Sequence, residues 1–266
     1  MPKRSFRVLA VPVLGVLAAA LLSAGCARRQ ALTAVSAGSP QPLPPLRTRG
    51  TRPYHVLRGD SQLRIRVYRG GPLAEVGHNH VITTSDILGT VYVREDIVHS
   101  GFQLRVPLAS LRVDEAAKRE QEGSDFRTHL TRSDRMATRR NMLGSSVLDV
   151  ARHPDLRLRS VGAVGPPWYP RINVRVTLHG VSRDYTVPTA IVRCGSRIVA
   201  VGGLTLRQSD FGIKPFSVLA GGLRVLDKLD VTFRLVLVPE SESVRREAGR
   251  GAGHGQRTPV APQEPQ

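Results

Sequence analysis

Alternation of apolar and polar residues is the dominant pattern over most of the chain. In the segment 171–178, Ile172, Val174, Val176 and Leu178 alternate with arginine and polar residues. Side chains point to opposite faces along a strand, so this segment has one apolar face. The same period predicts further strands at residues 62–69, 73–82, 88–93, 101–106, 155–161, 183–192, 197–207 and 229–238.

These segments, about eight or nine strands separated by short turns, predict an all-β fold. An antiparallel up-and-down β-barrel of about eight strands hides its edges by closing, and a two-sheet sandwich is the alternative. Residues 108–153 interrupt the alternation with a short helical insertion. There, Asp114 is expected to cap a short helix that ends at Gly123. A second helix is expected to begin near Thr131 and to run toward Leu143 or Val150, with Gly144 as a weak point.

The inward positions of the predicted strands are almost all aliphatic or aromatic. A barrel of about eight strands can be filled by its own side chains or can hold one small ligand. The apolar interior predicts an aliphatic ligand, bound without a cofactor or a catalytic group, and a barrel filled by its own side chains remains the alternative. The predicted lining residues are Leu63, Ile65, Val67, Phe102, Leu104, Leu156, Leu158, Ile172, Val174, Val176, Leu178, Leu204, Leu206, Phe211, Phe216, Val231, Phe233 and Leu235.

Three motifs resemble the YceI-like family of bacterial periplasmic proteins. They are QSDFGIKPFS at residues 208–217, VTLHGVSR at residues 176–183 and LDVTF at residues 229–233. The resemblance covers most of residues 54–238, and Asp149 stands where members of the family carry an aspartate. It implies a lipocalin-like barrel that holds a polyisoprenoid or a similar long lipid.

Polar residues near the ends of the predicted strands form a second group of candidates. His78 and His80 are two residues apart, so on a strand they would share one side, a spacing that can bind zinc. His179 is the candidate third ligand, although its phase in the strand points outward. The competing interpretation is a polar barrel mouth or a headgroup contact made by His78, Asn79, His80, His179 and Asp210. Asp210 is expected to accept backbone N–H groups in its turn.

The N-terminus has the features of a lipoprotein signal. Three basic residues precede an uncharged apolar run at residues 8–22, which is short for a membrane span, and small residues then precede Cys26. We therefore expect a signal peptide at residues 1–25 and a diacylglyceryl group on Cys26; an ordinary cleaved signal is the alternative. Ala27 is not an acidic retention residue, which favours the outer membrane over the inner one.

The expected organisation of the chain follows from composition. Residues 26–53 contain a cluster of prolines and no periodic apolar pattern, and they predict a flexible linker. Residues 54–240 are expected to form the barrel domain, and residues 241–266 predict a disordered tail. The net charge is +18, but the arginines alternate with core residues along the strands and so form a dispersed coat. That pattern, few aromatic residues and an export signal together argue against nucleic-acid binding.

Three functions remain open at this level. The first is a periplasmic, membrane-anchored, non-catalytic carrier of a long-chain isoprenoid or fatty-acyl lipid. The second is a histidine metal protein with hydrolytic or redox chemistry, centred on His78 and His80. The third is a structural envelope protein without a ligand. No Gly-x-Ser-x-Gly elbow is present, so nucleophilic catalysis has little support, and the sequence leaves open whether the chain forms a homodimer.

Overall fold

The computed structural model describes residue 43, residues 45–46 and residues 48–242. The predicted signal peptide, Cys26, most of the predicted linker and most of the predicted tail lie outside the described residues. Within the described part of the chain, no helix has the length and apolar character needed to cross a membrane.

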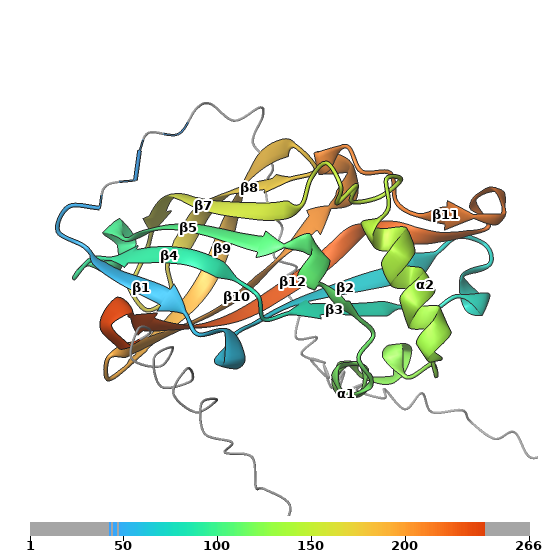
Figure 1. Cartoon of the computed structure of the whole chain (residues 1–266), viewed down its shortest axis with the longest axis horizontal. Helices are drawn as coiled ribbons and strands as arrows, with labels where there is room; N and C mark the ends of the chain where they lie inside the picture. Colours follow the sequence, from blue (N-terminus) through green and yellow to red (C-terminus); the bar gives the residue numbers. More distant parts are fainter. Residues whose placement is uncertain (1–42, 44, 47, 243–266) are drawn as a thin grey trace, which may run out of the picture. The chain divides into compact units, whose positions relative to one another are not determined.

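The described residues form an antiparallel β-structure with two helices (Figure 1). The strands are β1 (Arg52–Val56), β2 (Gln62–Gly70), β3 (His80–Thr84), β4 (Leu88–Val93), β5 (Gly101–Pro107), β6 (Arg112–Val113), β7 (Asp155–Val164), β8 (Arg171–Leu178), β9 (Val181–Cys194), β10 (Arg197–Arg207), β11 (Ser217–Val218) and β12 (Leu223–Pro239). The helices are α1 (Ala116–Arg119) and α2 (Arg132–Leu143).

Eight of these strands close into a barrel. They pair in the order β1, β4, β5, β7, β8, β9, β10, β12, and β12 pairs back with β1. Every neighbouring pair in this ring is antiparallel. The antiparallel barrel expected from the alternation, and the lipocalin-like fold that the resemblance implies, are therefore confirmed, and the sandwich alternative is wrong.

Strand β12 is long enough to serve two neighbours on one edge. Its last residues pair with β1, as in Val56↔Leu237, and its earlier residues pair with β2, as in Ile65↔Val231. Strands β3 and β6 continue the sheet beyond β2. The wall of the barrel is thus extended at the end where β12 begins, and Figure 1 shows β2 and β3 running beside β12 there.

Helix α2 begins where its sequence predicts and ends at Leu143, the nearer of the two expected ends. Thr131 is the N-cap: its hydroxyl accepts from the Asp134 N–H while the Asp134 carboxylate accepts from the Thr131 N–H, which forms a capping box. Arg139 then fastens the helix to the neighbouring connection, because its guanidinium donates to the carbonyl oxygens of Leu111 at 3.1 Å and Ala109 at 2.6 Å.

Two local expectations are wrong. The strand expected at residues 73–82 begins only at His80, because residues 71–77 form turns that include a 3-10 turn at Ala74–Val76. Asp114 does not cap the first helix, whose N-cap is Glu115. Asp114 instead has a φ of 55° and a fully buried side chain, which turns inward against β3. The helical segment still ends at Gly123, where φ is 90°.

Candidate functional site

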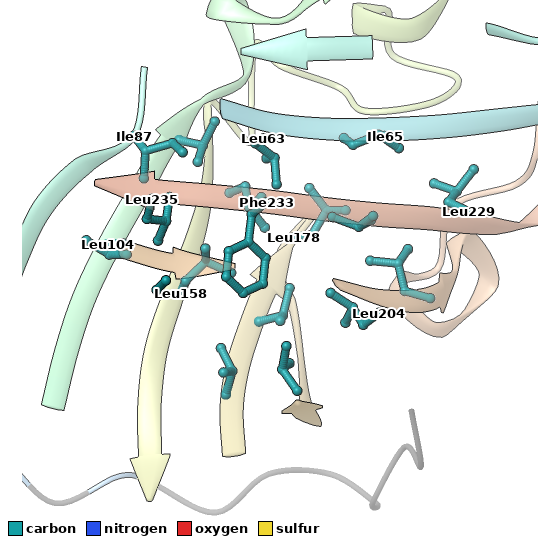
Figure 2. Close-up of a pocket in the computed structure, with 18 of the residues that line it drawn as sticks. Leu63, Ile65, Ile87, Leu104, Leu158, Leu178, Leu204, Leu229, Phe233 and Leu235 are labelled. Carbon is teal, nitrogen blue, oxygen red and sulfur yellow. The ribbon is translucent and has the colours of Figure 1, made fainter. Parts of the chain in front are cut away.

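A cavity runs through the interior of the barrel. Its volume is about 360 Å³, within the range of about 300–1,000 Å³ that is typical of ligand pockets. Figure 2 shows its wall: Leu63 and Ile65 from β2, Leu104 from β5, Leu158 from β7, Leu178 from β8, Leu204 from β10, and Leu229, Phe233 and Leu235 from β12 converge on one space. Strand alternation places these side chains on the inner face.

The predicted lining positions lie on the wall of this cavity with one exception. Phe211 does not line it; its ring is fully buried at the end of the barrel and lies 6.1 Å from the ring of Tyr185. The structure adds Thr138, Asn141 and Met142 of α2 to the wall. Alternation could not indicate them, because they come from the helical insertion and not from a strand.

Phe233 occupies the middle of the cavity in Figure 2. Phe233 in β12 pairs with Gly202 in β10. A Cβ atom at Gly202 would lie 2.7 Å from Cζ of the Phe233 ring and 2.7 Å from the carbonyl oxygen of Pro188. The absent side chain at Gly202 therefore leaves room for the phenyl ring against the barrel wall. A glycine is required here by close approach, not by backbone angle.

Four polar side chains line the α2 end of the cavity: His80, Thr138, Asn141 and Gln208. Three more polar side chains lie on the wall away from α2: Ser100, Ser160 and Thr189. The Gln208 side chain is tied to the wall, since its Nε2 donates to the carbonyl oxygen of Leu226 at 3.0 Å. Of the predicted polar mouth candidates, only His80 reaches the cavity wall.

His80 is held by a buried carboxylate that sequence reasoning assigned to another role. Nδ1 of His80 lies 2.6 Å from Oδ2 of Asp114, and Oδ1 of Asp114 accepts from the Val81 N–H at 2.9 Å and from Arg119 at 2.6 Å. Arg119 is itself buried. Burial alone would raise the pKa of Asp114, but the hydrogen bond and charge of His80, the Val81 amide and Arg119 together lower it below its usual value.

His78 and Asn79 precede β3. The imidazole rings of His78 and His80 are 4.7 Å apart, and burial together with the charge of His80 lowers the pKa of His78. Asn79 has a structural role: its Oδ1 accepts from the Arg69 N–H at 2.9 Å and its Nδ2 donates to the carbonyl oxygen of Asp125 at 3.2 Å. Among the described residues, no group of three potential metal ligands includes either histidine.

The turn chemistry expected of Asp210 belongs to Asp227. The Asp227 carboxylate accepts from both the backbone N–H and the hydroxyl of Ser209, at 2.8 and 2.6 Å. Asp210 instead accepts from the hydroxyl of Tyr185 at 3.2 Å. Burial, followed by the charge of Asp210, raises the pKa of Tyr185. His179 lies in the β8–β9 turn with a φ of 52°, away from the cavity wall.

The closed antiparallel barrel and its apolar interior define the chain as a lipocalin-like protein with an internal cavity. The sequence model of the YceI-like domain matches residues 61–237. The chain therefore belongs to the YceI-like family. A search of curated proteins found no match.

Solved structures with similar coordinates include three bacterial proteins. BcnA of Burkholderia cenocepacia has 14% identity and a TM-score of 0.49, with 68% of this chain and 98% of that chain covered. A polyisoprenoid-binding domain of Saccharophagus degradans has 13% identity and a TM-score of 0.46, with coverage of 70% and 98%. The YceI protein of Campylobacter jejuni has 11% identity and a TM-score of 0.41, with coverage of 57% and 80%.

Proposed function

We propose that the protein binds one long-chain lipid, an isoprenoid or a fatty-acyl chain, inside the barrel and carries or sequesters it without chemical change. The observation that carries the proposal is the apolar cavity, whose wall combines residues of the strands with residues of α2. The volume weighs against a barrel filled by its own side chains. Membership of the YceI-like family supports the same ligand class.

The energetics of such binding need no charged contact. Burial of a methylene group contributes about 0.8 kcal/mol, so about ten methylene groups contribute about 8 kcal/mol before the costs of ordering the chain and the ligand. The polar side chains His80, Thr138, Asn141 and Gln208 lie together at the α2 end of the cavity. The other polar side chains of the wall, Ser100, Ser160 and Thr189, already form hydrogen bonds with backbone groups. A lipid with one polar end would accordingly place that end near α2 and its hydrocarbon toward β1.

The cellular setting that we propose rests on the sequence. The basic, apolar and small-residue segments before Cys26 support export, lipidation of Cys26 and attachment to a membrane on the periplasmic side, with the outer membrane favoured. In that setting the carrier holds a water-insoluble ligand while remaining close to the membrane that supplies or receives it.

Lipid extraction and mass spectrometry of the native full chain test the proposal. A matched pair of variants on β10 links any bound lipid to the cavity. Ala200 lines the cavity between Ile191 and Leu235, whereas its neighbour Val201 is exposed on the outer face. Ala200→Phe places a phenyl ring inside the cavity, and Val201→Phe places the same ring outside.

We expect the wild type and Val201→Phe to retain one lipid per chain, and Ala200→Phe to lose it or to select a shorter one. Wild-type protein purified with no lipid, and unable to take up a fluorescent acyl or isoprenyl probe, would refute carriage. Equal amounts of a lipid of the same length in the two variants would place the lipid outside the barrel.

A further inference from the structure

Two histidines and a buried aspartate meet at one end of the barrel, outside the wall of the lipid cavity. Asp149 and His153 lie in the connection between α2 and β7, and His179 lies in the β8–β9 turn. One potential ligand atom from each of the three side chains lies within 4.8 Å of the other two. Asp149 is buried, while both histidines are only partly buried and so remain accessible from solvent.

The backbone around these residues adopts conformations that bring the side chains together. Asp149 has a φ of 46° and His179 a φ of 52°, in the left-handed region that few residues other than glycine adopt. The N–H of His153 donates to the carbonyl oxygen of Asp149 at 2.8 Å, which closes the turn between them. At Gly180 a Cβ atom would lie 3.0 Å from Cε1 of His153, so this glycine allows the two turns to approach each other.

Neighbouring groups already orient the potential ligands. Nδ1 of His179 lies 3.3 Å from the carbonyl oxygen of Phe211, and a proton on Nδ1 that is donated there leaves Nε2 free to coordinate. The rings of His153 and His179 are 4.8 Å apart. Nε of Arg152 donates to Oδ2 of Asp149 at 2.5 Å, which leaves Oδ1 as the coordinating oxygen. The Arg152 side chain is 77% exposed and can turn away.

We propose that Asp149, His153 and His179 bind a divalent transition-metal ion, with Zn²⁺ as the ion tested first. Two neutral imidazoles and one carboxylate form a three-ligand set that Zn²⁺ accepts, with a fourth position open to water. Tetrahedral coordination at zinc bond lengths places ligand atoms about 3.3 Å apart. Small side-chain rotations would therefore bring the three ligand atoms, now within 4.8 Å of one another, to coordinating distances. The bound ion would fasten the connection before β7 to the β8–β9 turn, independently of any lipid.

Competition for Zn²⁺ against a chromogenic chelator tests this site. The full chain is purified with a tag that contains no histidine and is stripped of metal beforehand. We expect one Zn²⁺ per chain, and a rise in the melting temperature when Zn²⁺ is added, because an ion that binds only the folded state stabilises it. His153→Ala and His179→Asn should each weaken binding at least tenfold; asparagine is chosen at position 179 because it tolerates a positive φ. The control is His99→Ala, which removes an exposed histidine of the β4–β5 connection.

A third variant tests the same site without removing a ligand. Arg152→Gln removes the positive charge beside Asp149 and should tighten Zn²⁺ binding severalfold, and the exposure of Arg152 makes a folding defect in this variant unexpected. Circular dichroism of the metal-free variants establishes that they fold. Wild-type protein that binds no Zn²⁺, folded His153→Ala and His179→Asn variants that bind it as the wild type does, or an Arg152→Gln variant with unchanged affinity would overturn the proposal.

Discussion

Replacement of Asp114 by asparagine should destabilise the protein by about 3–5 kcal/mol, the usual cost of removing one partner from a buried ion pair. The carboxylate is fully buried and lies 2.6 Å from both Nδ1 of His80 and the Arg119 guanidinium. Asparagine keeps the shape but removes the negative charge. Arg119 would then remain buried without a counterion, with only uncharged acceptors that include the carbonyl oxygens of Asn79 and Thr128.

The assays are urea denaturation and thermal melting at neutral pH, both followed by circular dichroism. For a domain of this size, about 3–5 kcal/mol corresponds to a fall in melting temperature of about 6–20 °C. Asp86→Asn is the matched control, because Asp86 pairs with Arg58 at 3.3 Å but both side chains are exposed. Exposed pairs contribute about 0–1 kcal/mol, so the control should change little.

The difference in unfolding free energy between the wild type and Asp114→Asn should depend on pH if the buried charge of Asp114 causes it. The folded state lowers the pKa of Asp114, so the charged carboxylate stabilises the protein fully above the ordinary carboxyl pKa of about 3.9. This contribution is lost as the pH falls through the lower folded-state pKa. The wild type and Asp114→Asn should therefore differ by the full amount at pH 5 to 7, and their stabilities should converge only below about pH 3.9. A loss of under about 1 kcal/mol at neutral pH, or a difference that does not change on acidification, would refute the reasoning.

Two further predictions concern the wall and the outer face of the barrel. Gly202→Ala should lower the free energy of unfolding by about 1–3 kcal/mol, because the added Cβ atom would lie 2.7 Å from both a phenyl ring and a backbone oxygen. Gly162→Ala is the control: no atom lies within 4 Å of its added Cβ, so the same melts should show almost no change. Burial, followed by its hydrogen bond to Asp230, raises the pKa of Tyr68 to about 12. The ultraviolet absorbance of tyrosinate that distinguishes the wild type from Tyr68→Phe should therefore appear only near that pH. A titration midpoint near the ordinary tyrosine pKa of about 10 would contradict the prediction.

Much of the barrel could be predicted because its determinants are local. Each strand with one apolar face shows a period of two regardless of its partners, and the capping box at Thr131 and Asp134 fixes the start of α2 within four residues. The start of β3 was not predictable in this way. Turn residues at positions 70–72 suggest a strand from Leu73, but the register that pairs Val67 with His80 leaves residues 73–79 in the connection.

The polar sites depend on contacts that are distant in the sequence. Asp114 resembles a helix cap, and only the position of His80, 34 residues earlier, reveals it as a buried counterion. The sequence groups His179 with His78 and His80 as candidate ligands, whereas the β8–β9 turn places it beside His153 and Asp149. Local spacing indicated that histidines and aspartates form the polar sites. Which of them come together is set by the order of the strands in the barrel.

The two ends of the barrel differ in how their walls are built, and this difference bears on how a ligand enters. At the β1 end, β9 pairs with β10 from Cys194 back to Thr189, and β1 joins β12 to β4. Toward the other end, the recorded β9–β10 pairing stops at Gly202, and the cavity wall there includes α2 and the connection that contains Gln208. Separating paired strands breaks a row of backbone hydrogen bonds, whereas moving α2 breaks mainly the side-chain bonds of Arg139 to Leu111 and Ala109. Opening at the α2 end therefore breaks fewer backbone hydrogen bonds than separating the strands, and four polar side chains of the cavity wall, His80, Thr138, Asn141 and Gln208, lie at this end.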